Sequence, residues 1–123
     1  MSYVYSGFSS PLTSTTAPST GSDLIKILSN SSSSGVLYLG NLLIQWGTTT
    51  NLSSGSGHSV SLNTTYSNAS DYMVVGVPGS GSQQDGTGIT MINSSNTTST
   101  FQVRMWGGGQ VGVNWLAIGK APT

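Results

Sequence analysis

The sequence predicts an all-β protein: an antiparallel β-sandwich of about six strands, preceded by an extended N-terminal arm. Three observations favour this class. Apolar residues fall into short runs, turn-forming residues separate these runs, and no stretch sustains the helical apolar period of about 3.6 residues. A chain of 123 residues can enclose one hydrophobic core but not two.

The first 34 residues are predicted to form an extended segment for attachment or oligomerisation. Pro11 and Pro18 stand among serines and threonines, and proline opposes both a helix and a central strand. The apolar stretch 23–28 is too short to distinguish a strand from a single helical turn. A serine linker follows it, so we place the sandwich domain at residues 35–123.

The strands of the sandwich are predicted from alternating residues and from the turns between them. Gly40-Asn41, between two β-forming runs, indicates a tight hairpin. The run 72–77 is predicted to be a buried strand that stops at Pro78-Gly79, and Gly107–Gly109 is predicted to be a turn. The remaining strands are expected at 59–62, 89–92, 100–105 and 111–118.

Charge is nearly absent from the chain, which excludes several kinds of partner. Lys+Arg and Asp+Glu are three each, so the formal net charge is zero. Nucleic acid and anionic membrane surfaces are therefore poor candidates, because both require clustered basic residues. No apolar run is long enough to cross a membrane, and the N-terminus lacks the features of a signal peptide. Low surface charge suits a chain buried against other chains or exposed outside cells.

Three segments, in order, carry a family resemblance: GNLLIQWG at 40–47, YSNASDYMVV at 66–75 and VNWLAIG at 113–119. Together they resemble the C-terminal receptor-binding domain of gp53-like phage tail fibre proteins, over about residues 35–120. The wider shape is similar to that of H-type lectins. The resemblance implies an antiparallel sandwich that forms a homotrimer.

The resemblance also implies a function on the surface of a virion, at a tail fibre or elsewhere on the particle. The domain would adhere to a glycan or protein of the host cell surface, and residues 1–34 would dock it to other virion proteins. Three linked copies would raise avidity without new contacts. The alternative is a capsid or tail decoration protein that binds no receptor. A free lectin is disfavoured by the missing signal peptide.

Trp106 and Arg104 are the leading candidates for receptor contact. They are two residues apart, so they share one face if the strand continues to the glycine turn. An exposed indole can stack on the apolar face of a sugar, and a guanidinium supplies hydrogen-bond donors. The competing interpretation is that Trp106 contacts a neighbouring subunit of a trimer and that Arg104 is either solvated or lies between subunits.

Gln84, Asp85 and His58 are weaker candidates. Gln84 and Asp85 lie in a polar, glycine-rich loop of the kind that often carries binding residues, although Asp85-Gly86 can also be a simple turn. His58 is the single histidine, and a plain loop histidine is the more common case. One histidine does not make a metal site, although a threefold axis could bring three copies together.

The sequence offers little for catalysis or cofactor binding, so we expect a non-enzymatic protein without cofactor or metal. A Ser-His-Asp set could be drawn from His58 and an aspartate, but no nucleophile-elbow motif accompanies it. The glycine-rich stretches lack the following Lys-Ser/Thr that a phosphate loop requires. Trp46 and Trp115 lie in apolar strands beside glycines and are predicted to belong to the core.

Overall fold

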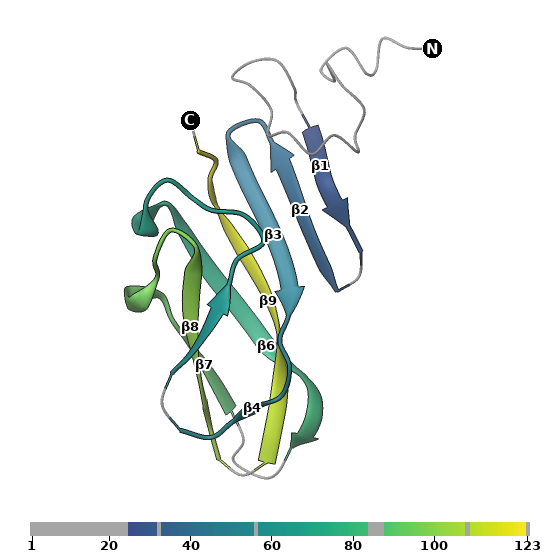
Figure 1. Cartoon of the computed structure of the whole chain (residues 1–123), viewed down its shortest axis with the longest axis vertical. Helices are drawn as coiled ribbons and strands as arrows, with labels where there is room; N and C mark the ends of the chain where they lie inside the picture. The colour runs from purple at the N-terminus through teal and green to yellow at the C-terminus, as the bar shows by residue number, and fades with distance from the viewer. Residues whose placement is uncertain (1–24, 32, 56, 84–87, 108, 123) are drawn as a thin grey trace.

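The computed structural model describes residues 25–31, 33–55, 57–83, 88–107 and 109–122. They form two antiparallel sheets packed as layers (Figure 1), which confirms the predicted all-β fold. The nine strands are β1(Ile25–Asn30), β2(Ser34–Leu39), β3(Leu42–Thr48), β4(Leu52–Ser53), β5(His58–Ser61), β6(Tyr72–Gln83), β7(Gly88–Ile92), β8(Thr100–Trp106) and β9(Gly109–Lys120). Two short 3₁₀ turns, η2(Ala69–Asp71) and η3(Asn93–Ser95), complete the described elements. Neither could span a membrane.

Sheet A, the larger sheet, contains six strands and is organised around β9. On one side β9 pairs with β3 and then, further along, with the two-residue strand β4. On its other side it pairs with β6. Strands β2 and β1 extend the sheet beyond β3. Sheet B contains three strands in the order β5-β8-β7 and covers one face of sheet A.

The structure has nine strands among the described residues, whereas the sequence predicts about six. One of the additional strands is β1. Residues 25–30, inside the predicted N-terminal arm, pair with β2 as a sixth strand of sheet A. The sheet therefore begins ten residues before residue 35, the first residue of the predicted sandwich. The rest of the arm, 1–24, lies outside the described residues.

The predicted hairpin at Gly40-Asn41 is present and joins β2 to β3. Gly40 has a φ of 59°, which the first position of a two-residue hairpin loop requires and which glycine adopts without strain. The register of this hairpin places Leu39 opposite Leu42 and fixes which residues of both strands face the core.

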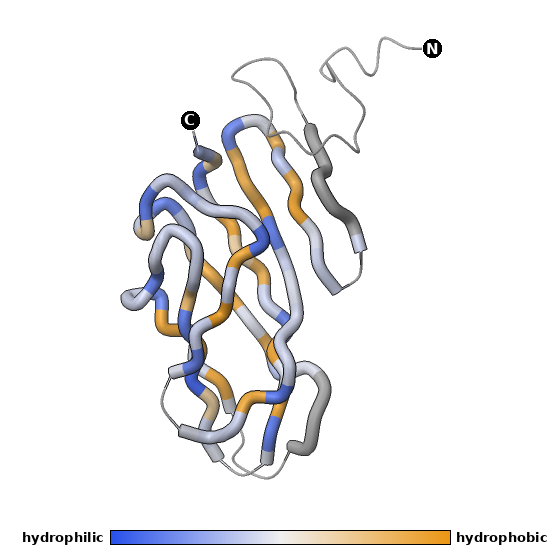
Figure 2. The backbone as a smooth tube through the Cα atoms, viewed as in Figure 1, coloured by the Kyte–Doolittle hydropathy of each residue, from blue (hydrophilic) through white to orange (hydrophobic). Residues whose placement is uncertain are grey.

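The core lies between the sheets, where strand residues are hydrophobic and the connecting loops are mainly hydrophilic (Figure 2). Trp115 is 4% exposed and packs edge-on against Phe101, with ring centroids 5.1 Å apart. Its partners on β3 and β6 are Gly47 and Gly76, and the absence of a side chain at Gly47 leaves space for the indole. Trp46 instead lies half-buried across Gly35 on the outer face of sheet A, and its N–H donates to the carbonyl oxygen of Ser31 (2.9 Å).

A buried amide holds the loop that follows β5 against the larger sheet. Gln45 is fully buried, and its Oε1 accepts hydrogen bonds from the backbone N–H groups of Asn63 and Thr64 at 2.8 and 3.0 Å. Its Nε2 donates to the carbonyl oxygen of Thr64 (3.0 Å). Nearby, the rings of Tyr66 and Tyr72 stack at 4.3 Å. The loop is therefore fixed by hydrogen bonds to a buried side chain of the larger sheet.

Strand β6 differs from the prediction of a buried strand that ends before Pro78. Its residues alternate, with Tyr72 and Val74 buried and Val75 exposed, so only one face is covered. The strand also continues beyond Pro78 to residue 83, with an irregularity in pairing between Pro78 and Gly81. Within the described residues β6 pairs only with β9, and an edge strand tolerates both a proline and a bulge.

Candidate functional site

Trp106 and Arg104 stand on the outer face of sheet B, at the end of β8. Burial alternates along this strand, with the side chains of Phe101, Val103 and Met105 in the core. The intervening residues therefore face outward, as the spacing of Arg104 and Trp106 predicts. Trp106 is 50% exposed, which is unusual for so large an apolar side chain on a strand.

The neighbouring strand leaves this pair accessible. Trp106 lies opposite Gly88 of β7, and a Cβ atom at Gly88 would stand 2.6 Å from the indole Nε1. Arg104 lies opposite the exposed Thr90. Among the described residues, Arg104 has no ion-pair partner and the Trp106 N–H has no hydrogen-bond acceptor. An apolar plane and a cation therefore lie on the same face of β8 at the surface.

Gln102 extends the polar part of this surface along β8. It lies opposite Ser59 of β5 and Ile92 of β7, so all three residues point to the outer face. Its Oε1 lies against Gly57, where a Cβ atom would be 2.6 Å away. We call the outward side chains of Trp106, Arg104, Gln102 and Thr90, with Gly88, the Trp106 surface.

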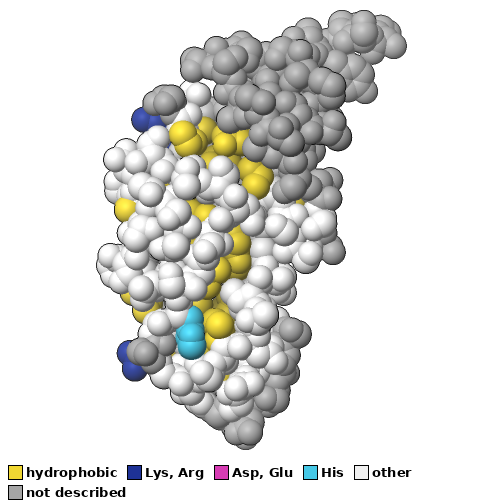
Figure 3. Space-filling model, viewed as in Figure 1, with side chains coloured by type: hydrophobic (Ala, Val, Ile, Leu, Met, Phe, Trp, Pro, Cys, Tyr) yellow, Lys and Arg dark blue, Asp and Glu magenta, His cyan; other side chains and the backbone are white. Residues whose placement is uncertain are grey.

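His58 does not belong to the Trp106 surface. It pairs with the buried Val103, and directly paired residues of an antiparallel sheet share a face, so the imidazole is on the core side. Its Nε2 lies 2.8 Å from the carbonyl oxygen of Ser53 in β4. His58 thus links the two sheets at one end of the sandwich. Figure 3 shows the histidine in cyan beside hydrophobic atoms, on a surface where basic side chains occur only at the margin.

The two loop candidates cannot be placed. Gln84 and Asp85 lie outside the described residues, in the segment 84–87 that leads into Gly88. The described residues contain no group of three His, Cys, Asp or Glu side chains that could hold a metal ion.

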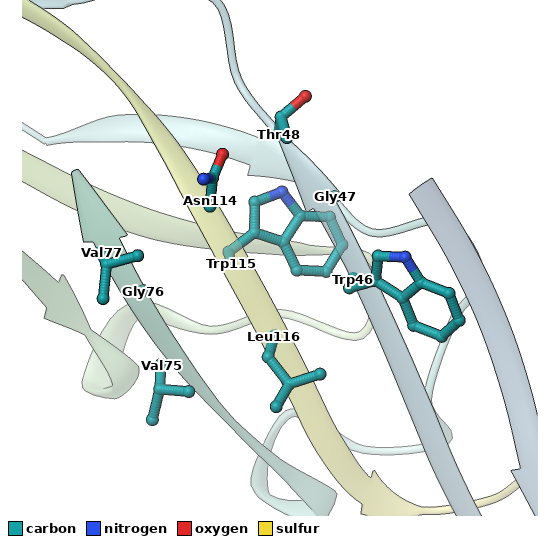
Figure 4. Close-up of a pocket in the computed structure, with 9 residues that line it drawn as sticks. All are labelled: Trp46, Gly47, Thr48, Val75, Gly76, Val77, Asn114, Trp115 and Leu116. Carbon is teal, nitrogen blue, oxygen red and sulfur yellow. The ribbon is translucent and has the colours of Figure 1, made fainter. Parts of the chain in front are cut away.

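A second surface feature, which the sequence did not reveal, is a groove of about 410 Å³ on the outer face of sheet A. Val75 and Val77 from β6, Leu116 from β9 and Trp46 from β3 form its apolar sides (Figure 4). Asn114 and Thr48 supply its few polar atoms. The apolar run 72–77 is compatible with such a groove, but a continuous apolar run does not tell whether the second face of the strand is covered by its own domain.

The chain is similar to known tail fibre proteins in sequence and in fold. A family model described as "putative tail fiber protein gp53-like, C-terminal" matches residues 37–120, which is more than half of the chain. No curated protein sequence matches.

Two solved structures share the fold. A structure of the C-terminal part of the P. aeruginosa R2 pyocin fibre is 19% identical with a TM-score of 0.54, over 77% of this chain and 25% of that one. An N-truncated R2-type pyocin tail fibre is 18% identical with a TM-score of 0.57, over 77% of this chain and 37% of that one. The matched part of this chain thus spans between about a quarter and somewhat more than a third of the chains in these two structures.

Proposed function

Since the chain belongs to the gp53-like tail fibre C-terminal family, we propose that it is a non-enzymatic adhesion module at the surface of a phage-like particle. It binds a glycan or protein of the host cell surface, and it does so as a homotrimer. The Trp106 surface makes the contact. The juxtaposition of an exposed indole and a guanidinium that has no ion-pair partner among the described residues carries this proposal.

The chemistry of the Trp106 surface suits a sugar ring. One face of a pyranose is lined by C–H groups and packs on an aromatic plane, and the indole offers such a plane at 50% exposure. The hydroxyl groups at the ring edge require donors and acceptors. Arg104 supplies donors only, whereas the Gln102 amide and the Thr90 hydroxyl supply both kinds.

We expect weak binding by each copy at the Trp106 surface. Gly88 contributes no side chain beside the indole, so β7 does not enclose a ligand there. Homotrimerisation compensates for this weakness, because linked sites rebind before the particle leaves the cell. An adhesin of this kind tolerates a low affinity at each site.

Binding of the recombinant chain to a glycan array and to whole bacterial cells tests the proposal. Trp106→Ala abolishes detectable binding, while Trp106→Phe, which keeps a flat apolar ring, retains part of it. Arg104→Met removes charged hydrogen bonds worth about 1.5–3 kcal/mol and weakens each site by roughly tenfold or more. Ser61→Ala, at the other end of sheet B, is the matched control and leaves binding unchanged. Absence of binding by the folded wild-type chain would favour a decoration protein that binds no receptor.

A further inference from the structure

The outer face of sheet A concentrates the exposed apolar side chains of the described residues. Six large hydrophobic side chains of the described residues are exposed, and one of them, Trp106, lies on sheet B. The other five belong to sheet A: Leu39, Met73, Val75, Val77 and Leu116. Met73 and Val77 are each 59% exposed, so little of this chain's described part covers them.

Strand register aligns these side chains into two apolar rows across β6, β9, β3 and β2. Directly paired residues share a face, so each row can be read from the pairing. One row is Met73, Ile118, Ile44 and Leu37; the next is Val75, Leu116, Trp46 and Gly35. We call these two rows the apolar face.

Polar residues bound the apolar face at both ends but do not interrupt it. Thr48 and Asn114 are paired at one end, and Lys120 lies opposite Leu42 at the other. Within the rows the one polar group is the indole N–H of Trp46, which already donates to Ser31. A contiguous apolar patch with a polar rim is the mark of a protein interface. It offers a sugar almost no hydrogen-bonding groups.

The charge distribution favours a second copy of this chain as the occupant. The apolar face carries no charged side chain and the whole chain has no net charge, so the apolar faces of three copies can converge on a threefold axis without desolvating or opposing charges. Residues 9–24 are mainly Ser, Thr, Pro and Gly, so the preceding chain supplies apolar side chains chiefly from residues 1–8. These are Met1, Tyr3, Val4, Tyr5 and Phe8, which are fewer than the eight positions of the two rows. We infer that copies of this chain pack against one another through the apolar face. The inference rests on the proposed homotrimer and identifies the surface on which its subunits meet.

Sedimentation velocity of the full chain, over a wide range of concentration, tests the inference. The wild type sediments at three times its single-chain mass of 12.6 kDa. Val75→Glu places a charge in the centre of the apolar face and raises the concentration needed for assembly by roughly 100-fold. Because Val75 is 54% exposed in the single chain, the variant keeps its fold, which circular dichroism verifies. Ser61→Glu adds the same charge to sheet B and leaves assembly unchanged.

A second measurement locates the contact directly. The chain has no cysteine, so Val75→Cys and Ser61→Cys each introduce a single thiol. In the assembled protein the thiol at 75 is protected from alkylation and becomes reactive on dilution, while the thiol at 61 reacts at all concentrations. A wild type that is monomeric throughout, an assembly that survives Val75→Glu, or a thiol at 75 protected in the single chain by residues 1–24 would each overturn the inference. Neither measurement uses a receptor, so a failure of receptor binding is distinguished from a failure of this inference.

Discussion

The indole of Trp106 lies across Gly88, its partner in the β7–β8 pairing, with Nε1 where a side chain at position 88 would begin. Any larger residue at position 88 would have to displace the indole. The glycine therefore sets the position of the ring without covering it. Gly88, which belongs to the Trp106 surface, also follows the segment 84–87 directly in the sequence.

This arrangement predicts that Gly88→Val displaces the indole and weakens receptor binding about as much as loss of the ring does. The introduced valine side chain would occupy the space that Trp106 now fills. Binding to cells and the unfolding midpoint should be measured together. A strong loss of binding with a small change in midpoint is expected, because both residues lie on the outer face. Undiminished binding would show that the ring position does not matter.

The buried amide of Gln45 is predicted to contribute strongly to stability. Gln45→Leu has a similar volume but leaves the N–H groups of Asn63 and Thr64 without their acceptor. Loss of the acceptor for these two partly buried groups should cost about 1–3 kcal/mol each at most, so the free energy of unfolding should fall by about 2 kcal/mol. Denaturation in guanidinium chloride measures this. Gln102→Leu, on the surface of sheet B, serves as the control, and an equal loss in both variants would contradict the assignment.

The close approach between β9 and the η2 turn predicts that Gly119→Ala is strongly destabilising. A Cβ atom at this position would collide with the carbonyl oxygen of Asp71 and the backbone of Tyr72. Backbone atoms cannot turn away as a side chain can, so we expect a cost of about 1–3 kcal/mol or more. Thermal unfolding against a Ser61→Ala control gives the comparison. A variant as stable as the wild type would mean that this contact relaxes freely.

Stability is predicted to fall at alkaline pH, chiefly through Tyr72. Burial, and to a smaller extent Tyr66, raises the pKa of Tyr72 from 10.0 to about 12. The unfolded chain therefore loses this proton first, so stability is complete below pH 10 and is lost as the pH rises toward 12. One such group contributes a slope of about 1.4 kcal/mol per pH unit within that window.

Denaturation curves at several pH values test this prediction. Burial also raises the pKa values of Tyr38 and Tyr66, so some pH dependence remains when Tyr72 is removed. Tyr72→Phe should reduce the slope of the unfolding free energy against pH by the contribution of one titrating group. It should also lower stability at neutral pH, because the Tyr72 hydroxyl donates to the carbonyl oxygens of Thr97 and Thr100. An unchanged slope would exclude Tyr72 as its source.

Local sequence patterns predict much of this fold because the signals lie within single strands and turns. Gly40-Asn41 carries its own turn geometry, and the alternation in β8 places Arg104 and Trp106 on one face without knowledge of the partner strands. The closing strand around Trp115 is evident for the same reason.

Features that depend on pairing between distant strands could not be predicted. The run 72–77 is apolar throughout, and sequence alone does not tell whether its second face is covered by its own domain or by another molecule. The orientation of His58 depends on its register with Val103, which the turns around it do not fix. The Gln45 contacts join residues 18 and 19 positions apart, and no local pattern indicates them.

The indole N–H resonances of the three tryptophans offer the most direct test of the central claim, that the receptor binds at the Trp106 surface. They report on three separate environments: the core for Trp115, the apolar face for Trp46 and the surface of sheet B for Trp106. Single Trp→Phe variants assign the resonances. Titration with the best glycan from the array should shift the Trp106 resonance and leave the other two in place. A shift of the Trp46 resonance with Trp106 unmoved would contradict the account and place the receptor on the apolar face.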